Sequence, residues 1–168
     1  CQQEIEMDTC PMNLDTRARI LVYIAAHNTG SLATERDGMP WATSLFYAND
    51  DFTLYFLAEP KTRHVQNVAQ NQRVAVTISE DYRHWRLIQG VQIEGHGEEI
   101  THPIELVKAG SIYNAKFPCM GELRHVPKEL GTAMAKVRLH KITPTWVRFI
   151  DNTRGLGFKD EIRFQERK

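Results

Sequence analysis

Four consecutive residues gather positive charge and hydrogen-bonding capacity at the start of a predicted short helix, and they are Lys61, Thr62, Arg63 and His64. The helix is predicted over residues 61–70. Pro60 suits its entry, because the N–H that proline lacks has no helical partner there. The N-terminal end of a helix is already positive, so two cations at this place are unfavourable unless an anion binds. Backbone N–H groups, a hydroxyl and two cations together suit a phosphate group, and the alternative is a solvated basic turn.

The residues on either side of this turn predict the elements that position it. Residues 53–58 alternate in apolar character and include aromatic and β-branched residues, which predicts a half-buried strand. Val65, Val68 and Ala69 then share one face of the helix. The apolar run over residues 73–78 predicts a buried strand after it.

Turn signals elsewhere predict further strands of an antiparallel sheet. Asp37-Gly38 predicts a hairpin formed by residues 31–35 and 41–48. A long strand is predicted over residues 85–99, and a last hairpin around Pro144 closes the sheet. The sequence therefore predicts a mainly β protein, built on a six-stranded antiparallel barrel that is closed or partly open.

Two more helices are predicted to flank this barrel, at about residues 14–28 and 103–115. In the second of them, the spacing of Ile104, Val107 and Ile112 predicts the buried face. Residues 1–13 are polar and are predicted to form an N-terminal tail, which leaves residues 14–168 as one domain.

Composition excludes several classes of protein. The 168 residues are 42% hydrophobic, which is enough for one substantial core. Lys and Arg number 21, as do Asp and Glu, so there is no overall positive charge to attract nucleic acid or an anionic membrane. No apolar stretch approaches the ~20 residues that cross a bilayer, so no membrane span is predicted.

Cysteine and histidine usage argues against disulfides and metal. Cys1, Cys10 and Cys119 are odd in number and have no metal-ligand spacing, which favours a reducing compartment and a cytoplasmic location. The seven histidines are scattered and form no zinc motif, so no metal site is predicted.

Residues 31–97 resemble the pyridoxamine 5'-phosphate oxidase-like, FMN-binding split-barrel superfamily. The resemblance lies in four features that follow one another in order and at matching spacing: "LAT…DG-P-ATSLFY", "LYF-A-P-K-R-H-N", "RVAVTI" and "GVQIEG". It implies an FMN cofactor, and a homodimer with the flavin at the subunit interface. The other subunit would then supply part of the site, from residues 85–93 or from the region near Trp146.

The resemblance also implies roles for particular residues. Lys61, Thr62 and Arg63 would hold the FMN phosphate, with His64 and Asn67 close to the phosphate or the ribityl chain. Thr43 and Ser44 would lie beside the flavin ring, on a strand where Trp41 and Ala42 serve for packing. Gln89 is a further ring contact. No catalytic residue is singled out, because a flavin exchanges hydride or electrons without a protein nucleophile.

The implied function is that of an FMN-binding oxidoreductase or flavin reductase-like protein that acts on a small molecule. Oxidation of pyridoxamine phosphate itself is not expected, because the C-terminal segment FIDNTRGLGFKDEIRF keeps Arg154 but lacks the Trp and the Arg-Leu-His segment of those oxidases. The alternatives are a relative that binds the deazaflavin F420, a haem-binding relative with His64 or His125 as ligand, and a non-catalytic flavin-binding or sensing dimer.

Overall fold

The structure is a computed structural model that describes residues 14–118 and 136–165. The predicted tail, His125 and the three cysteines lie outside these residues. The elements in chain order are α1 (Leu14–Ala26), β1 (Thr29–Arg36), β2 (Met39–Phe46), β3 (Ala48–Asp50), β4 (Thr53–Ala58), α2 (Arg63–Gln70), β5 (Arg73–Ser79), η1 (Trp85–Leu87), β6 (Gln89–Glu99), α3 (Pro103–Lys116), β7 (Arg138–Asp151), η4 (Asn152–Arg154) and β8 (Lys159–Arg163).

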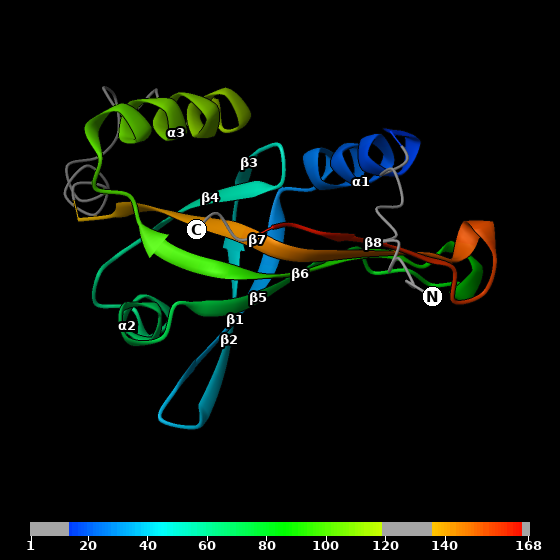
Figure 1. Ribbon diagram of the computed structural model, residues 1–168, viewed down its shortest axis with the longest axis horizontal. Helices are drawn as coiled ribbons and strands as arrows, with labels where there is room; N and C mark the ends of the chain where they lie inside the picture. Colours follow the sequence, from blue (N-terminus) through cyan, green and yellow to red (C-terminus); the bar gives the residue numbers. More distant parts are fainter. Residues whose placement is uncertain (1–13, 119–135, 166–168) are drawn as a thin grey trace, which may run out of the picture.

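The strands form one curled antiparallel sheet in the order β2-β1-β5-β6-β7-β4-β3, and β8 pairs with β7 (Figure 1). The helices α1 and α2 pack on the inward face of this sheet, in one cluster with Leu54 and Phe56, whereas α3 packs on the opposite face at Tyr55. The predicted mainly β, antiparallel split-barrel class is confirmed. The described residues form eight strands rather than the predicted six, since β3 and β8 are added.

The predicted hairpin around Pro144 is wrong, because β7 is one continuous strand of 14 residues. The pairing of β6 with β7 shifts at this place, so that Glu94 faces Trp146 while Gly95 faces Pro144. Thr145 is the extra residue of this bulge, and its Oγ1 donates to the Glu94 carbonyl at 3.2 Å. A proline is tolerated in a strand where the ladder is interrupted, since its missing N–H then leaves no partner unpaired.

The core lies inside the curled sheet, where both α1 and α2 pack against it. Residues that alternate along the strands point into it and are fully or almost fully buried, among them Leu32, Leu54, Phe56, Ile78, Ile93 and Val147. From α1, Ile20 and Ile24 complete it, and both side chains have no exposed surface.

The predicted buried face of α3 is largely wrong. Ile104 and Val107 are about three-quarters exposed, whereas Ile112 is partly buried. The helix instead packs on the sheet through Ala109, which clusters with Tyr55 and Ile100, and Tyr113 is its other buried residue. Apolar side chains occur all around α3, so spacing alone did not select the face that packs.

Gly95 permits the closest backbone approach in the barrel. A Cβ at this position would lie 2.3 Å from the Thr143 carbonyl oxygen and 3.1 Å from Pro144 Cα, and both of these atoms belong to the backbone of β7. We therefore expect Gly95→Ala to lower the free energy of unfolding by about 1–3 kcal/mol or more, as overpacking does. Urea denaturation measures this change.

Gly110→Ala is the matched control, because its Cβ would meet only Leu139 Cδ1, at 3.8 Å. Alanine is the better helix former, so this change should stabilise the protein by about 0.5–1 kcal/mol. Equal effects of the two substitutions would show that the β6–β7 approach is not a constraint on the fold.

Candidate functional site

The start of α2 presents backbone donors that have no partner. The Thr62 N–H donates to the Glu59 carbonyl at 3.0 Å, and the first helical bond runs from Gln66 N–H to the Thr62 carbonyl. The three amides between them have no acceptor in the described part of the chain. Thr62 does not cap them, because its Oγ1 donates to the Glu59 carbonyl at 2.8 Å. These three N–H groups are therefore available to a ligand.

Two cations lie at the same turn. Lys61 is exposed and just precedes the helix, which begins at Arg63 rather than at the predicted residue 61. The Arg63 guanidinium lies 4.4 Å from the centre of the Trp41 ring. This cation–π contact occupies the face of the guanidinium, and its N–H edges make no ion pair with any described residue. Arg63 is thus placed by β2 while its donors stay free.

His64 adds a neutral imidazole to the turn. Its Nε2 lies 3.2 Å from Thr62 Oγ1, whose own proton goes to Glu59, so Nε2 carries the proton of this bond. Burial lowers the pKa of His64, and the positive charge of a protonated His140 would lower it further. The Thr62 hydroxyl is therefore engaged within the protein, and the donors that this turn offers an anion are backbone amides, Lys61 and Arg63.

His140 lies beneath the turn and was not singled out from the sequence. It is 1% exposed and stacks on Phe56, with ring centres 5.1 Å apart. Its Nδ1 bonds to the Arg138 carbonyl at 3.1 Å, while its buried Nε2 has no partner among the described residues. In the sequence, one signal could have identified His140 as inward-facing. It lies two residues before the apolar Ile142 in a predicted strand, and alternate residues of a strand share a face.

Asn67 anchors α2 to the β1–β2 hairpin. It is 3% exposed, and its Nδ2 donates to Thr34 Oγ1 at 3.0 Å. Thr34 in turn pairs with Trp41 across the hairpin. Asn67 thus helps to hold the basic turn against Trp41, and its predicted contact with a ligand stays a prediction.

The predicted β2 residues divide between two faces of the hairpin. Trp41 pairs with buried Thr34, and Thr43 pairs with buried Leu32, so both face the side on which α2 packs. Ser44 pairs with Ser31 and, like Ala42, points to the opposite face. The structure therefore brings Thr43, but not Ser44, to the side of the basic turn.

Gln89 lies at the far end of β6 from this turn. Its Nε2 donates to Asp151 Oδ1 at 3.0 Å, at the start of the strand. The α2 helix reaches β6 near Gly97, where Val68 would meet an added Cβ at 3.4 Å. Eight residues of strand separate the two places by about 26 Å. Gln89 and the basic turn of one chain therefore do not meet.

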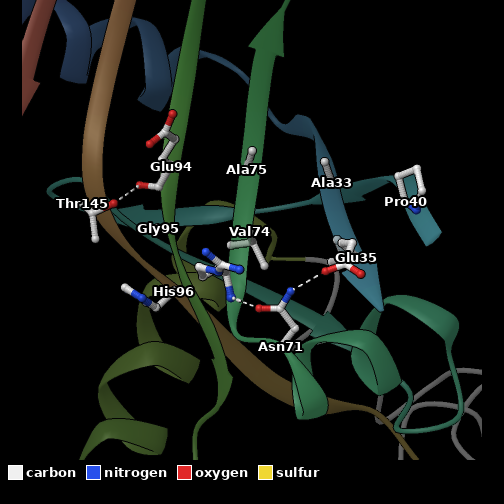
Figure 2. A pocket seen from close by; sticks show the side chains of 12 residues that line it. Ala33, Glu35, Pro40, Asn71, Val74, Ala75, Glu94, Gly95, His96 and Thr145 are labelled. Carbon is white, nitrogen blue, oxygen red and sulfur yellow. Dashed lines mark hydrogen bonds between the residues drawn. The ribbon is translucent and has the colours of Figure 1, made fainter. Parts of the chain in front are cut away.

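A separate groove of about 590 Å³ runs over the outer face of β1, β5 and β6. Figure 2 shows Ala33 and Ala75 on its floor, with Glu35 and Asn71 joined by a hydrogen bond of 2.8 Å. The exposed side chains of β5 alternate with buried ones, and α1, α2 and α3 contact other surfaces. The groove is thus an uncovered sheet face, distinct from the basic turn.

Comparison with known proteins assigns the family. The sequence profile described as "Pyridoxamine 5'-phosphate oxidase" matches residues 17–151, which is most of the chain. The chain belongs to this family. A UPF0306 protein of Enterobacter sp. (strain 638) is 30% identical over 151 residues, covering 87% of this chain and 95% of that protein.

Two solved structures share the fold. A FAD-binding protein from Mesorhizobium loti superimposes with a TM-score of 0.62 at 21% identity, covering 82% of this chain and 94% of its own. A heme binding protein from Mycobacterium smegmatis gives a TM-score of 0.66 at 19% identity, covering 84% and 55%. At these identities the likeness concerns the fold, so the ligand must be argued from the residues of the site.

Residues 14–118 and 136–165 contain no group of three or more His, Cys, Asp or Glu side chains placed to hold a metal ion. None of their helices is both long and apolar enough to cross a membrane. Arg154, the residue retained from the oxidase pattern, lies over Phe158 at 4.2 Å and 3.7 Å from Asp160.

Burial of His64 and His140 predicts that acid destabilises the fold. The pKa of each is lowered by burial; for His140, hydrogen bonding to Arg138 and the charge of Glu99 oppose the change. At pH values near 6.5 the two histidines therefore bind protons in the unfolded chain but not in the folded chain. For this reason the free energy of unfolding should fall as the pH drops below about 6.5. Urea denaturation between pH 7 and 5 measures the slope.

His140→Leu is the informative variant, because leucine does not titrate. Its unfolding free energy should fall less steeply with pH than that of the natural chain, whatever its stability at pH 7. Identical slopes for the two proteins would mean that His140 is not held neutral by the fold.

Proposed function

We propose that this protein is an FMN-binding oxidoreductase of the flavin reductase-like kind, with the FMN phosphate held at the start of α2. The single observation that carries the proposal is the uncapped first turn of that helix, whose three amides lie beside Lys61 and Arg63. A phosphate monoester is the part of FMN that such a turn binds.

The residues present fit this group in charge and in donor type. A dianion neutralised by two cations removes the repulsion that the helix dipole imposes on Lys61 and Arg63. Arg63 is held at Trp41 before any ligand arrives, so less conformational entropy is lost when its planar edge meets two phosphate oxygens. The neutral imidazole of His64 adds no further positive charge to be compensated.

A bound flavin would supply the transfer of hydride or electrons, and the chain would supply position. Trp41 and Thr43 occupy the face of β2 beside the basic turn, where the ribityl chain and the ring would continue from the phosphate. Asn67, through Thr34, keeps α2 at its fixed distance from β2. A cytoplasmic location is part of this proposal, since the spacing of the three cysteines indicates no disulfide framework.

A homodimer belongs to the same proposal. Gln89 cannot reach the flavin bound at α2 of its own chain, because the length of β6 separates them. A second copy could bring Gln89 to that flavin. The exposed face around Ala33 and Ala75 supports such an association, since small side chains on a sheet allow close packing.

Oxidation of pyridoxamine phosphate is not proposed, because Arg154 is engaged with Asp160 and Phe158 and the rest of the oxidase clamp is missing. For haem, His64 offers a weaker argument, since its Nε2 already bonds to Thr62. An absorbance spectrum of the purified protein distinguishes these outcomes, as flavin and haem absorb at different wavelengths.

Loss of a phosphate contact should weaken FMN selectively. Arg63→Ala removes a charge-assisted hydrogen bond worth about 1.5–3 kcal/mol, which corresponds to a roughly ten- to hundredfold weaker affinity. Lys61→Ala should act in the same direction. Riboflavin lacks the phosphate, so its affinity should change little in either variant. Titration followed by flavin fluorescence gives all four dissociation constants.

Val65→Ala serves as the control, because Val65 is 8% exposed on the buried face of the same helix. It should lower stability and affect the two flavins alike. If Arg63→Ala weakened FMN and riboflavin equally, the basic turn would not be a phosphate site.

The proposed dimer predicts an effect of charge on the uncovered face. Ala75→Arg places a charge and a long side chain in the groove and should convert a dimer into monomers in light scattering. Ser111→Arg, at an exposed position of α3, should leave the mass unchanged. A natural chain that scatters as a monomer at micromolar concentration while flavin is bound would contradict the dimer.

A further inference from the structure

Lys116 occupies an unusual environment for a lysine. It is the last residue of α3, and its Nζ donates to the His27 carbonyl at 2.5 Å. The same Nζ lies 4.3 Å from the centre of the Tyr47 ring and 5.9 Å from that of Phe117. The ammonium is thus surrounded by one neutral carbonyl and two aromatic rings, and the side chain is half-buried.

The described groups around Lys116 supply no negative charge. Lys116 forms no ion pair with a carboxylate of the described residues. Tyr47 stays neutral, since burial raises its pKa and its hydroxyl donates to the Ile24 carbonyl at 2.6 Å. The His27 ring faces away, with Nε2 2.8 Å from Glu80 and Nδ1 2.6 Å from the Tyr23 carbonyl. Charged Lys116 is therefore desolvated without full compensation.

Two other lysines on the same side of the sheet have the opposite surroundings. Lys108 forms an ion pair with Asp50, and Lys141 lies 3.2 Å from Glu98 and 2.7 Å from Glu105. Hydrogen bonding to Asp50 raises the pKa of Lys108. Burial acts to lower the pKa of Lys141, but its bonds to Glu105 and Glu98 raise it overall.

These surroundings make the Lys116 amine a better nucleophile near neutral pH. Burial lowers the pKa of Lys116 to about 8. At pH 7.5 roughly a quarter of such an amine is neutral, against about 0.1% for a lysine of ordinary pKa. Only the neutral amine has a lone pair with which to attack a carbonyl carbon, so Lys116 is primed for acyl transfer.

We propose that Lys116 is the preferred site of lysine acylation on this protein, with an activated acyl donor such as an acyl phosphate as the co-substrate. The Nζ lone pair attacks the acyl carbon, and the bond from that carbon to the phosphate oxygen breaks. Phosphate leaves with the electron pair, and Nζ loses one proton to it or to solvent. The products are an amide at Lys116 and inorganic phosphate, with no change of oxidation state.

The structure accommodates the product better at Lys116 than at the other two lysines. An amide keeps one N–H on Nζ, which can still donate to the His27 carbonyl, and the desolvated charge is gone. Acylation of Lys108 or Lys141 would instead remove an ion pair and leave a carboxylate without its cation. Environment therefore favours Lys116 in both the rate of the reaction and the stability of its product.

The test is incubation of the full chain with acetyl phosphate at pH 7.5, followed by peptide mass spectrometry. Lys116 should be acetylated at least about tenfold faster than Lys108 or Lys141, which serve as references in the same digest, because its larger neutral fraction outweighs the lower nucleophilicity of a less basic amine. Its rate should level off near pH 8, whereas the reference rates should still rise above pH 9. In a denaturing concentration of urea the three rates should converge, because the selectivity comes from the fold.

Lys116→Arg is the matched variant, since it keeps a cation over Tyr47 and removes the nucleophile. It should lose the fast phase of acetylation and leave the reference lysines unchanged. Acetylation of Lys116 at or below the rate of Lys108 at pH 7.5, or a rate that still rises above pH 9, would overturn the proposal. Neither result depends on whether the protein binds FMN.

Discussion

The close approach of β6 to β7 at Gly95 is the constraint on which the rest of the fold depends. Before the bulge, residues 138–142 of β7 pair with β4; beyond it, residues 146–150 pair with β8, while β6 accompanies the strand throughout. One strand can serve both neighbours only if it bends, and Pro144 with the extra residue Thr145 provides that bend. Because a Cβ at Gly95 would overlap backbone atoms of β7, the bend requires glycine.

The position of α2 follows from this curled sheet. Val65 and Val68 bury against the barrel, and Gly97 leaves room for the Val68 methyl groups. Asn67 then fixes the rotation of the helix through its bond to Thr34. With two apolar contacts and one buried hydrogen bond, the helix has a single docked orientation, and its free N-terminal amides emerge beside Trp41. The position of the basic turn, which we propose as the phosphate site, thus follows from how the helix packs, with Arg63 placed by stacking on Trp41 rather than by an ion pair.

The molecule has two exposed surfaces that the described residues of one chain leave without a binding partner. The basic turn offers donors and cations, while the groove over β1, β5 and β6 exposes small side chains of a sheet face that none of the described helices covers. Gln89, the predicted contact of the flavin ring, lies at the opposite end of β6 from the basic turn and bonds to Asp151. In the homodimer proposed above, a second copy of the chain would lie against the groove and complete the site at the basic turn.

The sequence by itself determined the elements and the local chemistry, because hydrophobic period, turn residues and the basic cluster at residues 61–64 are properties of neighbours along the chain. Those signals predicted the β class, the three helices within a few residues, and the Asp37-Gly38 hairpin. They misread Pro144 as a turn and the exposed Ile104 and Val107 as buried, since a bulge and the choice of helix face are set by partners distant in sequence. Only the tertiary structure decided that Trp41 meets Arg63, that the Thr62 hydroxyl is already engaged, and that His140 lies neutral beneath the turn, because each depends on strands brought together by the bend at Gly95.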